Sequence, residues 1–142
     1  MTNLFKPLHD INFNQPYPKN SYNWLRQGIY LDQSSYGVSV FTDSFIPKGT
    51  IIEQAIMLPI KGPPDIGHYN DHLFTWSDDR TIWCAGTGLT SFYNHSDTPN
   101  IVKKSNLKTN IMQVYALNDI EPNTQLTNTY LSKKWRECFK KF

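Results

Sequence analysis

The part of this sequence best equipped for chemistry is a dense polar turn, Asn94-His95-Ser96, followed closely by Pro99-Asn100. Asparagine and serine side chains bond readily to nearby backbone and proline fixes φ, so an isolated turn of this composition is most often a capped surface turn. Its surroundings favour a binding role instead. The glycine-containing stretch AGTGLTSFY leads into the turn, and the block YALNDIEPNTQLTNTY follows it and ends on Tyr130. A rigid polar turn can present backbone donors and acceptors to a ligand, and Tyr130 adds a phenol.

A second pair of chemically capable residues is His68 and His72, whose spacing can place two metal ligands on one face of a helix. The metalloprotease pattern requires a glutamate directly after the first histidine, where this sequence has Tyr69. No third ligand is evident in the sequence, and Gly67 weakens a helix there. We therefore expect no metal site.

These groups must be positioned by a chain of 142 residues, which suits one domain with a real core. The sequence predicts strands, bounded by turn residues, in residues 28–33, 36–42, 50–60, 80–86 and 110–119. Residues 65–76 are the one helical candidate in the middle of the chain. Apolar residues recur at helical spacing from Leu131 to Phe142, which predicts a C-terminal helix that docks on the body.

The charge and cysteine content argue against several classes of protein. Lys and Arg number 14 against 12 Asp and Glu, a formal net charge of +2, which does not predict nucleic-acid binding. No apolar run is long enough to span a membrane, and the N-terminus lacks the pattern of a secretory signal. Cys84 and Cys138 fit a reducing compartment. We therefore expect an intracellular protein, cytoplasmic or, in a eukaryotic source or host, nuclear, with no nucleic-acid or membrane partner.

Three ordered blocks of this sequence resemble the SET-domain protein lysine methyltransferases, with a layout most like that of the minimal, zinc-free members of virus type. The polar-turn block matches at Gly88, Leu89, Phe92, Asn94, His95, Ser96, Pro99 and Asn100. The following block matches at Ala116, Leu117, Asp119, Ile120, Pro122, Leu126, Thr127 and Tyr130. An upstream block matches at Tyr36, Gly37, Val38, Phe41, Ile46, Lys48, Gly49 and Glu53.

The resemblance implies a mainly β fold: the SET-domain, β-clip-like architecture of short curved sheets with a few short helices and a C-terminal pseudoknot. It divides the chain into an irregular N-terminal arm (1–28), a SET-like domain (29–130) and a C-terminal helical segment (131–142) that closes the cofactor site. The activity it implies is methyl transfer from S-adenosylmethionine to a lysine side chain of a protein substrate. Histones are the familiar targets of the family.

The resemblance also implies the residues of the site. Tyr130 would be the catalytic residue. The cofactor-binding residues would be Ser35, Tyr36, Gly37, Asn94, His95 and Trp135. The channel for the target lysine would be lined by Tyr36, His72, Tyr93 and Asn128.

The sequence departs from the family pattern at several of these positions. Ser35 stands where the family has a glycine, and Asn123-Thr124-Gln125 replaces the usual Gly-Glu-Glu. Asn128-Thr129 replaces an aromatic and acidic pair whose aromatic often decides how many methyl groups fit. These departures motivate an alternative, a catalytically inactive SET-like fold acting as a protein-binding module. An unrelated β-rich interaction domain is a third interpretation. The substrate, the product and the oligomeric state stay open, with a homodimer as one option.

Overall fold

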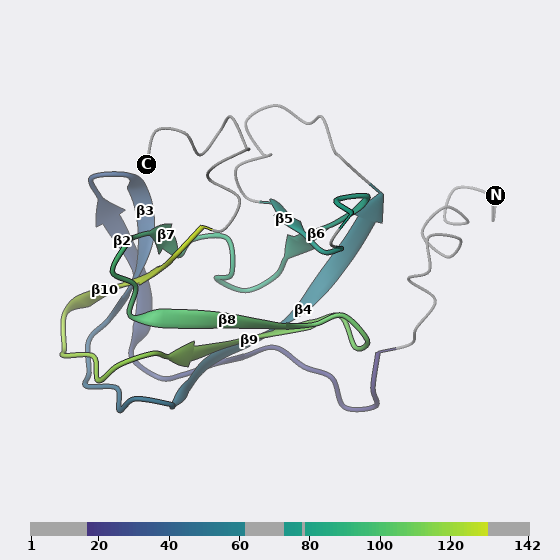
Figure 1. The fold of residues 1–142 in the computed structure, drawn as a ribbon. Coiled ribbons are helices and arrows are strands. Elements are labelled where there is room, and N and C mark those ends of the chain that lie inside the picture. The colour runs from purple at the N-terminus through teal and green to yellow at the C-terminus, as the bar shows by residue number, and fades with distance from the viewer. Residues whose placement is uncertain (1–16, 62–72, 78, 131–142) are drawn as a thin grey trace.

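The computed structural model describes residues 17–61, 73–77 and 79–130, which form two β-sheets with no helix among them, and hence none that could cross a membrane. The strands are β1 (Trp24–Leu25), β2 (Ile29–Ser34), β3 (Gly37–Thr42), β4 (Ile51–Lys61), β5 (Leu73–Thr75), β6 (Ile82–Gly86), β7 (Asn94–His95), β8 (Ile101–Asn106), β9 (Ile111–Ala116) and β10 (Thr124–Asn128). In Figure 1, β2, β3, β7 and β10 gather at one end of the domain, while β4, β5 and β6 extend toward the other. The mainly β prediction is confirmed.

The larger sheet is organised by β4, a long strand that pairs with two partners in succession. Residues 51–56 pair antiparallel with β9, and residues 57–61 pair antiparallel with β6. The order of strands is β5-β6-β4-β9-β8, with β1 also on β4. In β9, Met112, Val114 and Ala116 are buried and the residues between them are partly exposed. This is the period-two alternation of a strand with one face on the core.

The smaller sheet joins segments that are far apart in the chain, in the order β2-β3-β10-β7. β2 and β3 form a hairpin in which Ser34 lies opposite Gly37. β10 pairs antiparallel with β3 and parallel with β7. The last strand of the described chain is therefore inserted between this hairpin and the polar turn.

One apolar cluster holds the two sheets together. It contains Val40 and Leu126 from the smaller sheet, and Ile52, Ile101 and Val114 from the larger sheet, each at most 1% exposed. Full burial of a side chain of this kind contributes about 1.5–3 kcal/mol relative to exposure. This cluster therefore fixes how the sheets meet.

The crossing of β10 past the polar turn depends on Asn100. Its Oδ1 accepts a hydrogen bond from the N–H of Thr127 at 2.8 Å, and its Nδ2 donates to the carbonyl of Gln125 at 2.8 Å. Its own N–H donates to the carbonyl of Thr127 at 3.1 Å, and the N–H of Ser96 donates to the carbonyl of Asn128 at 2.9 Å. These bonds make the crossing that the expected C-terminal pseudoknot requires.

The structure corrects one helix prediction. The helix expected over residues 65–76 is wrong at its C-terminal end, because Leu73–Thr75 forms β5 and pairs with β6. Leu73 is buried there, so pairing with an existing strand outweighs a weak helical pattern. Within the expected N-terminal arm, Trp24–Leu25 pairs with β4. Residues 1–16, residues 62–72 and the predicted C-terminal helix lie outside the described residues.

Replacing Asn100 with alanine should lower the free energy of unfolding by about 1–3 kcal/mol, because the N–H of Thr127 and the carbonyl of Gln125 lose their partner. Urea denaturation followed by tryptophan fluorescence measures this loss. Asn118→Ala is the control, since the Asn118 side chain is exposed and donates only a 3.4 Å bond to the carbonyl of Pro99. Equal destabilisation by the two variants would show that the crossing does not depend on Asn100.

Candidate functional site

Tyr130 is held at its backbone by His95. The N–H of Tyr130 donates to Nδ1 of His95 at 2.9 Å, and Nε2 of His95 lies 2.9 Å from Oδ1 of Asp97. Because Nδ1 accepts a hydrogen bond, the proton of the neutral ring lies on Nε2, which donates to Asp97. The two rings also pack at a centroid distance of 5.3 Å. The imidazole therefore acts as an orienting group between the polar turn and the end of β10.

The phenol of Tyr130 is held at its far end as well. Its hydroxyl donates to the backbone carbonyl of Tyr93 at 2.8 Å. The Tyr93 ring is buried in the apolar cluster between the sheets, with an exposure of 1%. A carbonyl fixed in the core thus determines where the Tyr130 hydroxyl lies.

The parallel pairing of β7 with β10 gives this region two chemically different faces. Asn94 lies beside Thr127, and His95 lies beside Asn128. Side chains alternate along a strand, so Asn128 shares a face with His95, while Asn94 shares the opposite face with Gln125. The bond from Nδ2 of Asn94 to Oε1 of Gln125, at 3.3 Å, agrees with this division.

The turn between β2 and β3 reaches the Asn94 face. Nδ2 of Asn94 donates to Oγ of Ser34 at 3.1 Å. The same Oγ donates to the carbonyl of Gly37 at 2.8 Å and accepts from the N–H of Tyr36 at 3.2 Å. Ser34 therefore connects the polar turn to the residues 34–37, the hairpin turn.

Two ionisable groups lie behind Tyr93, the buried Glu53 and the partly buried Lys103. Glu53 is 2% exposed, and it accepts the Tyr93 hydroxyl on Oε1 at 2.7 Å and the N–H of Leu89 on Oε2 at 2.7 Å. Burial raises the pKa of the Glu53 carboxyl above its usual range, and these two hydrogen bonds oppose that rise. The amine of Lys103 donates to the carbonyl of Thr90 at 2.9 Å and lies 5.3 Å from the centre of the Tyr93 ring.

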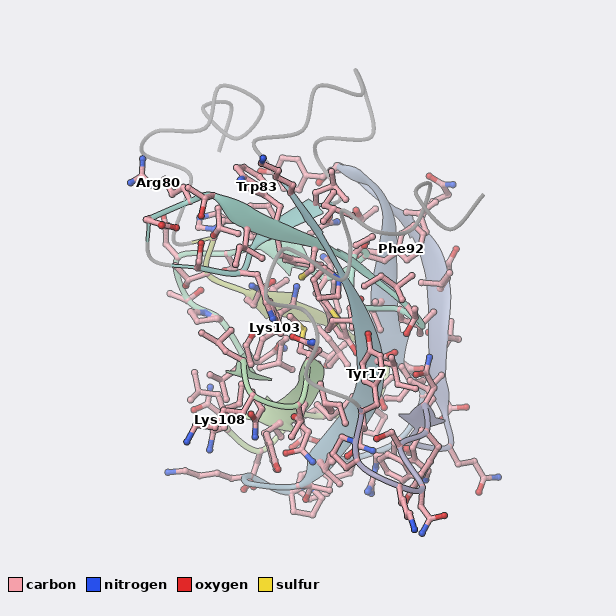
Figure 2. All side chains as sticks on the ribbon, turned by 90° about the vertical axis from the view of Figure 1, so that its right-hand side faces the viewer. Tyr17, Arg80, Trp83, Phe92, Lys103 and Lys108 are labelled. Carbon is pink, nitrogen blue, oxygen red and sulfur yellow. The ribbon has the colours of Figure 1, made fainter. Side chains whose placement is uncertain are left out.

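Lys103 differs from the other lysines of its hairpin in its surroundings. Burial lowers the pKa of Lys103 to about 7, although the nearby Glu53 carboxylate acts in the opposite direction. Figure 2 shows Lys103 near the middle of the domain, whereas Lys108 extends outward at its edge. Its amine also lies 4.5 Å from the centre of the Phe74 ring, a cation–π geometry.

The structure brings most of the predicted site residues together. Tyr130, His95 and the Tyr93 carbonyl are in direct contact, and Asn128 lies on the same face. Asn94 contacts the hairpin turn that contains Ser35, Tyr36 and Gly37 through Ser34. The side chain of Tyr93 points to Glu53, so its carbonyl is the part that meets Tyr130. His72 and Trp135 lie outside the described residues.

Ser34, Gln125, Asp97, Glu53 and Lys103 were not among the predicted site residues, although each contacts a residue that was. Asp97 had a signal in the sequence, since a carboxylate two residues after a histidine can reach its ring. Ser34 and Gln125 depend on strand register, which the sequence does not show. Within the described residues, no group of three or more His, Cys, Asp or Glu side chains could hold a metal ion.

Comparison with known proteins gives a consistent result. The family model of the SET domain matches residues 37–131. The Schizosaccharomyces pombe histone-lysine N-methyltransferase specific for H3 lysine-37 is 29% identical over 111 residues, which cover 75% of this chain and 74% of that protein. The crystal structure of a candidate histone methyltransferase of Plasmodium falciparum has 27% identity and a TM-score of 0.62, covering 79% of this chain and 100% of that one.

A more distant structural neighbour is KRYPTONITE, crystallised with mCHH DNA, an H3(1-15) peptide and SAH. Its TM-score is 0.61 at 20% identity, and the match covers 80% of this chain and 25% of that chain. At this identity the likeness extends to the fold alone.

The buried amine should make stability depend on pH above neutrality. The pKa of Lys103 falls from its ordinary 10.5 to about 7 in the folded protein, so the unfolded chain binds more protons between these values. The contribution of this group to the free energy of unfolding should therefore rise with pH above about 7, by at most about 1.4 kcal/mol per pH unit. Urea denaturation between about pH 7 and pH 9 measures the slope.

The slope should be shallower in Lys103→Met, which removes the titrating amine. Lys104→Met is the matched control, because the neighbouring Lys104 is exposed and packs on the Tyr115 ring at 4.9 Å. If Lys103→Met retained the slope of the wild type, Lys103 would not be the group that titrates.

Proposed function

Because this chain belongs to the SET-domain family, we propose that it transfers a methyl group from S-adenosylmethionine to a lysine side chain of a protein substrate. The single observation that supports this most strongly is the placement of the Tyr130 phenol. It is fixed by His95 at the backbone and by the Tyr93 carbonyl at the hydroxyl, next to the polar turn. A hydroxyl held this firmly can align an incoming amine with a methyl donor.

S-adenosylmethionine, when bound, supplies a methyl group activated by a positively charged sulfur. The residues that would hold it are Asn94 and the hairpin turn of residues 34–37. Gly37 has φ +101°, and a Cβ added there would meet no atom within 4 Å, so a ligand can approach this backbone closely. Asn94 is 9% exposed and hydrogen-bonded to Ser34 of the turn, so the positions of its polar groups are fixed before a ligand binds. KRYPTONITE was crystallised with SAH, which supports the same class of donor here.

The chemistry on the amine side follows from the groups around Tyr130. A lysine amine has an ordinary pKa of about 10.4 and must lose a proton before it attacks. A site that excludes water and holds a positive ligand disfavours the ammonium form, so a dedicated carboxylate base is not required. The Tyr130 oxygen and the Tyr93 carbonyl can orient the N–H groups of the amine. Alignment of two reactants can lower a barrier by roughly 7–11 kcal/mol.

Asn128 offers a third acceptor on the same side. Its Oδ1 is buried and has no hydrogen-bond partner among the described residues. Buried carbonyl oxygens normally have a partner, so this oxygen fits an N–H donor supplied by the substrate amine or by a water beside it.

We propose histone H3 as the first substrate to test. The S. pombe relative is named for lysine 37 of H3, and KRYPTONITE was crystallised with an H3 peptide. The deciding experiment is transfer of a radiolabelled methyl group from S-adenosylmethionine to recombinant H3 and, in parallel, to a cell lysate. Labelled lysine in a protein band supports the proposal. If calorimetry detects no binding at high micromolar S-adenosylmethionine, the inactive protein-binding module becomes the better interpretation.

Tyr130→Phe should reduce kcat for methyl transfer by at least about 100-fold, because the ring stays but the hydroxyl that aligns the amine is lost. The dissociation constant for S-adenosylmethionine should change by less than about twofold. Methyl-transfer kinetics and calorimetry give the two values. Tyr115→Phe is the control, since it removes a phenol bonded to Gln113 on β9. Full turnover in Tyr130→Phe would exclude the phenol from catalysis.

Asn94→Ala should weaken binding of S-adenosylmethionine by about tenfold, the loss expected when one hydrogen bond to a charged ligand is removed. Calorimetry measures the dissociation constant, and circular dichroism checks that the sheet content is retained. The exposed Asn118→Ala variant should bind as the wild type does. Equal affinity in both variants would remove Asn94 from the cofactor site.

A further inference from the structure

Glu53 is a buried carboxylate that the pairing of β4 with β9 does not itself require. The register between these strands shifts between Ile51 and Glu53. A bulge of this kind lets consecutive side chains turn inward, and Ile52 and Glu53 are 0% and 2% exposed. Burial of a carboxylate is unfavourable unless it is hydrogen-bonded. The groups that Glu53 hydrogen-bonds therefore indicate its role.

Glu53 holds both ends of the chain segment that leads into the polar turn. One oxygen accepts the N–H of Leu89 at 2.7 Å, and the other accepts the hydroxyl of Tyr93 at 2.7 Å. Gly88 permits this approach, because its φ is +62° and a Cβ there would collide with Oε2 of Glu53. The amine of Lys103 fixes a third point of the same segment, the carbonyl of Thr90.

Tyr93 links this anchored segment to the phenol of Tyr130. Its hydroxyl is bound by Glu53, and its backbone carbonyl accepts the hydroxyl of Tyr130 at 2.8 Å. The next residue, Asn94, begins β7. A shift of the Tyr93 ring would therefore move the carbonyl that sets the position of the Tyr130 hydroxyl.

We propose that Glu53 is a positioning residue for methyl transfer, acting through Tyr93 on the hydroxyl of Tyr130. This rests on the proposed function for the role of Tyr130 in turnover. Glu53 does not contact the reacting groups; it fixes the acceptor that aligns them. Lys103 stabilises the same segment through the carbonyl of Thr90.

A double-mutant cycle tests whether Glu53 acts through Tyr93. Tyr93→Phe removes only the hydroxyl that Glu53 binds, and should lower kcat about tenfold at saturating S-adenosylmethionine, with KM for the protein substrate within about twofold. Glu53→Leu should lower kcat further, because the N–H of Leu89 also loses its partner. The double variant should match Glu53→Leu alone, since the two residues act on one path. If the fold-loss of kcat in the double variant equalled the product of the losses in the two single variants, the proposal would be overturned.

Two further variants separate positioning from general destabilisation. Glu53→Gln keeps a side chain that can bridge Leu89 and Tyr93, so kcat should return to within about threefold of the wild type. Tyr115→Phe, which removes a phenol from β9 outside this path, should leave kcat unchanged. The same loss of kcat in Tyr115→Phe as in Tyr93→Phe would assign the effect to lost stability.

A spectroscopic measurement tests the link without turnover. In protein labelled with ¹³C at Cζ of tyrosine, the Tyr130 signal is identified by its loss in Tyr130→Phe. This signal should shift in Tyr93→Phe and in Glu53→Leu, and stay in place in Tyr115→Phe. An unmoved Tyr130 signal in Tyr93→Phe, which should fold even where Glu53→Leu does not, would overturn the proposal. If the wild type transferred no methyl group, the proposed function would fail while this spectrum still reported on the path from Glu53 to Tyr130.

Discussion

The site depends on one crossing, the passage of β10 beside the polar turn. The parallel pairing of β7 with β10 covers only two positions, Thr127 with Asn94 and Asn128 with His95. A ladder this short is weak by itself. The side chain of Asn100 compensates, because it binds two backbone groups of β10 as a neighbouring strand would. Tyr130 is two residues beyond β10, so its contacts with His95 and Tyr93 exist only because this crossing forms.

The crossing also separates the two halves of the proposed chemistry. The alternation of side chains places Asn94 and Gln125 on one face of the β7–β10 pair and His95 and Asn128 on the other. The first face meets the hairpin turn through Ser34, and the second meets Tyr130. A reaction between a bound donor and a long side chain needs its two partners to approach the same point from different directions. The two faces of this strand pair would keep the groups proposed for the donor apart from the groups proposed for the amine.

The sequence predicts the parts of this arrangement that have local signals, and it misses those set by register. Alternation correctly indicates β9, and the motif residues His95 and Tyr130 do meet. β8 was not predicted, because its residues go from buried at Ile101 to exposed at Asn106 without alternating. Ser34 contacts Asn94, whereas the neighbouring Ser35 is a central residue of the turn. Which of the two serines reaches Asn94 depends on the geometry of the hairpin. The family assignment is confirmed, whereas the roles of His72 and Trp135 stay predictions because these residues lie outside the described part of the chain.

The buried charges behind Tyr93 are better explained by geometry than by stability. Well-packed apolar residues of the same volume often stabilise a protein as much as desolvated ionisable groups do, because a charged group loses its hydration when it leaves water. The raised pKa of Glu53 and the lowered pKa of Lys103 are the signs of that desolvation. Apolar substitutes, however, could not bind the N–H of Leu89, the hydroxyl of Tyr93 and the carbonyl of Thr90. The two ionisable groups thus fix three points along one short segment, and the end of that segment is the carbonyl on which the Tyr130 hydroxyl rests.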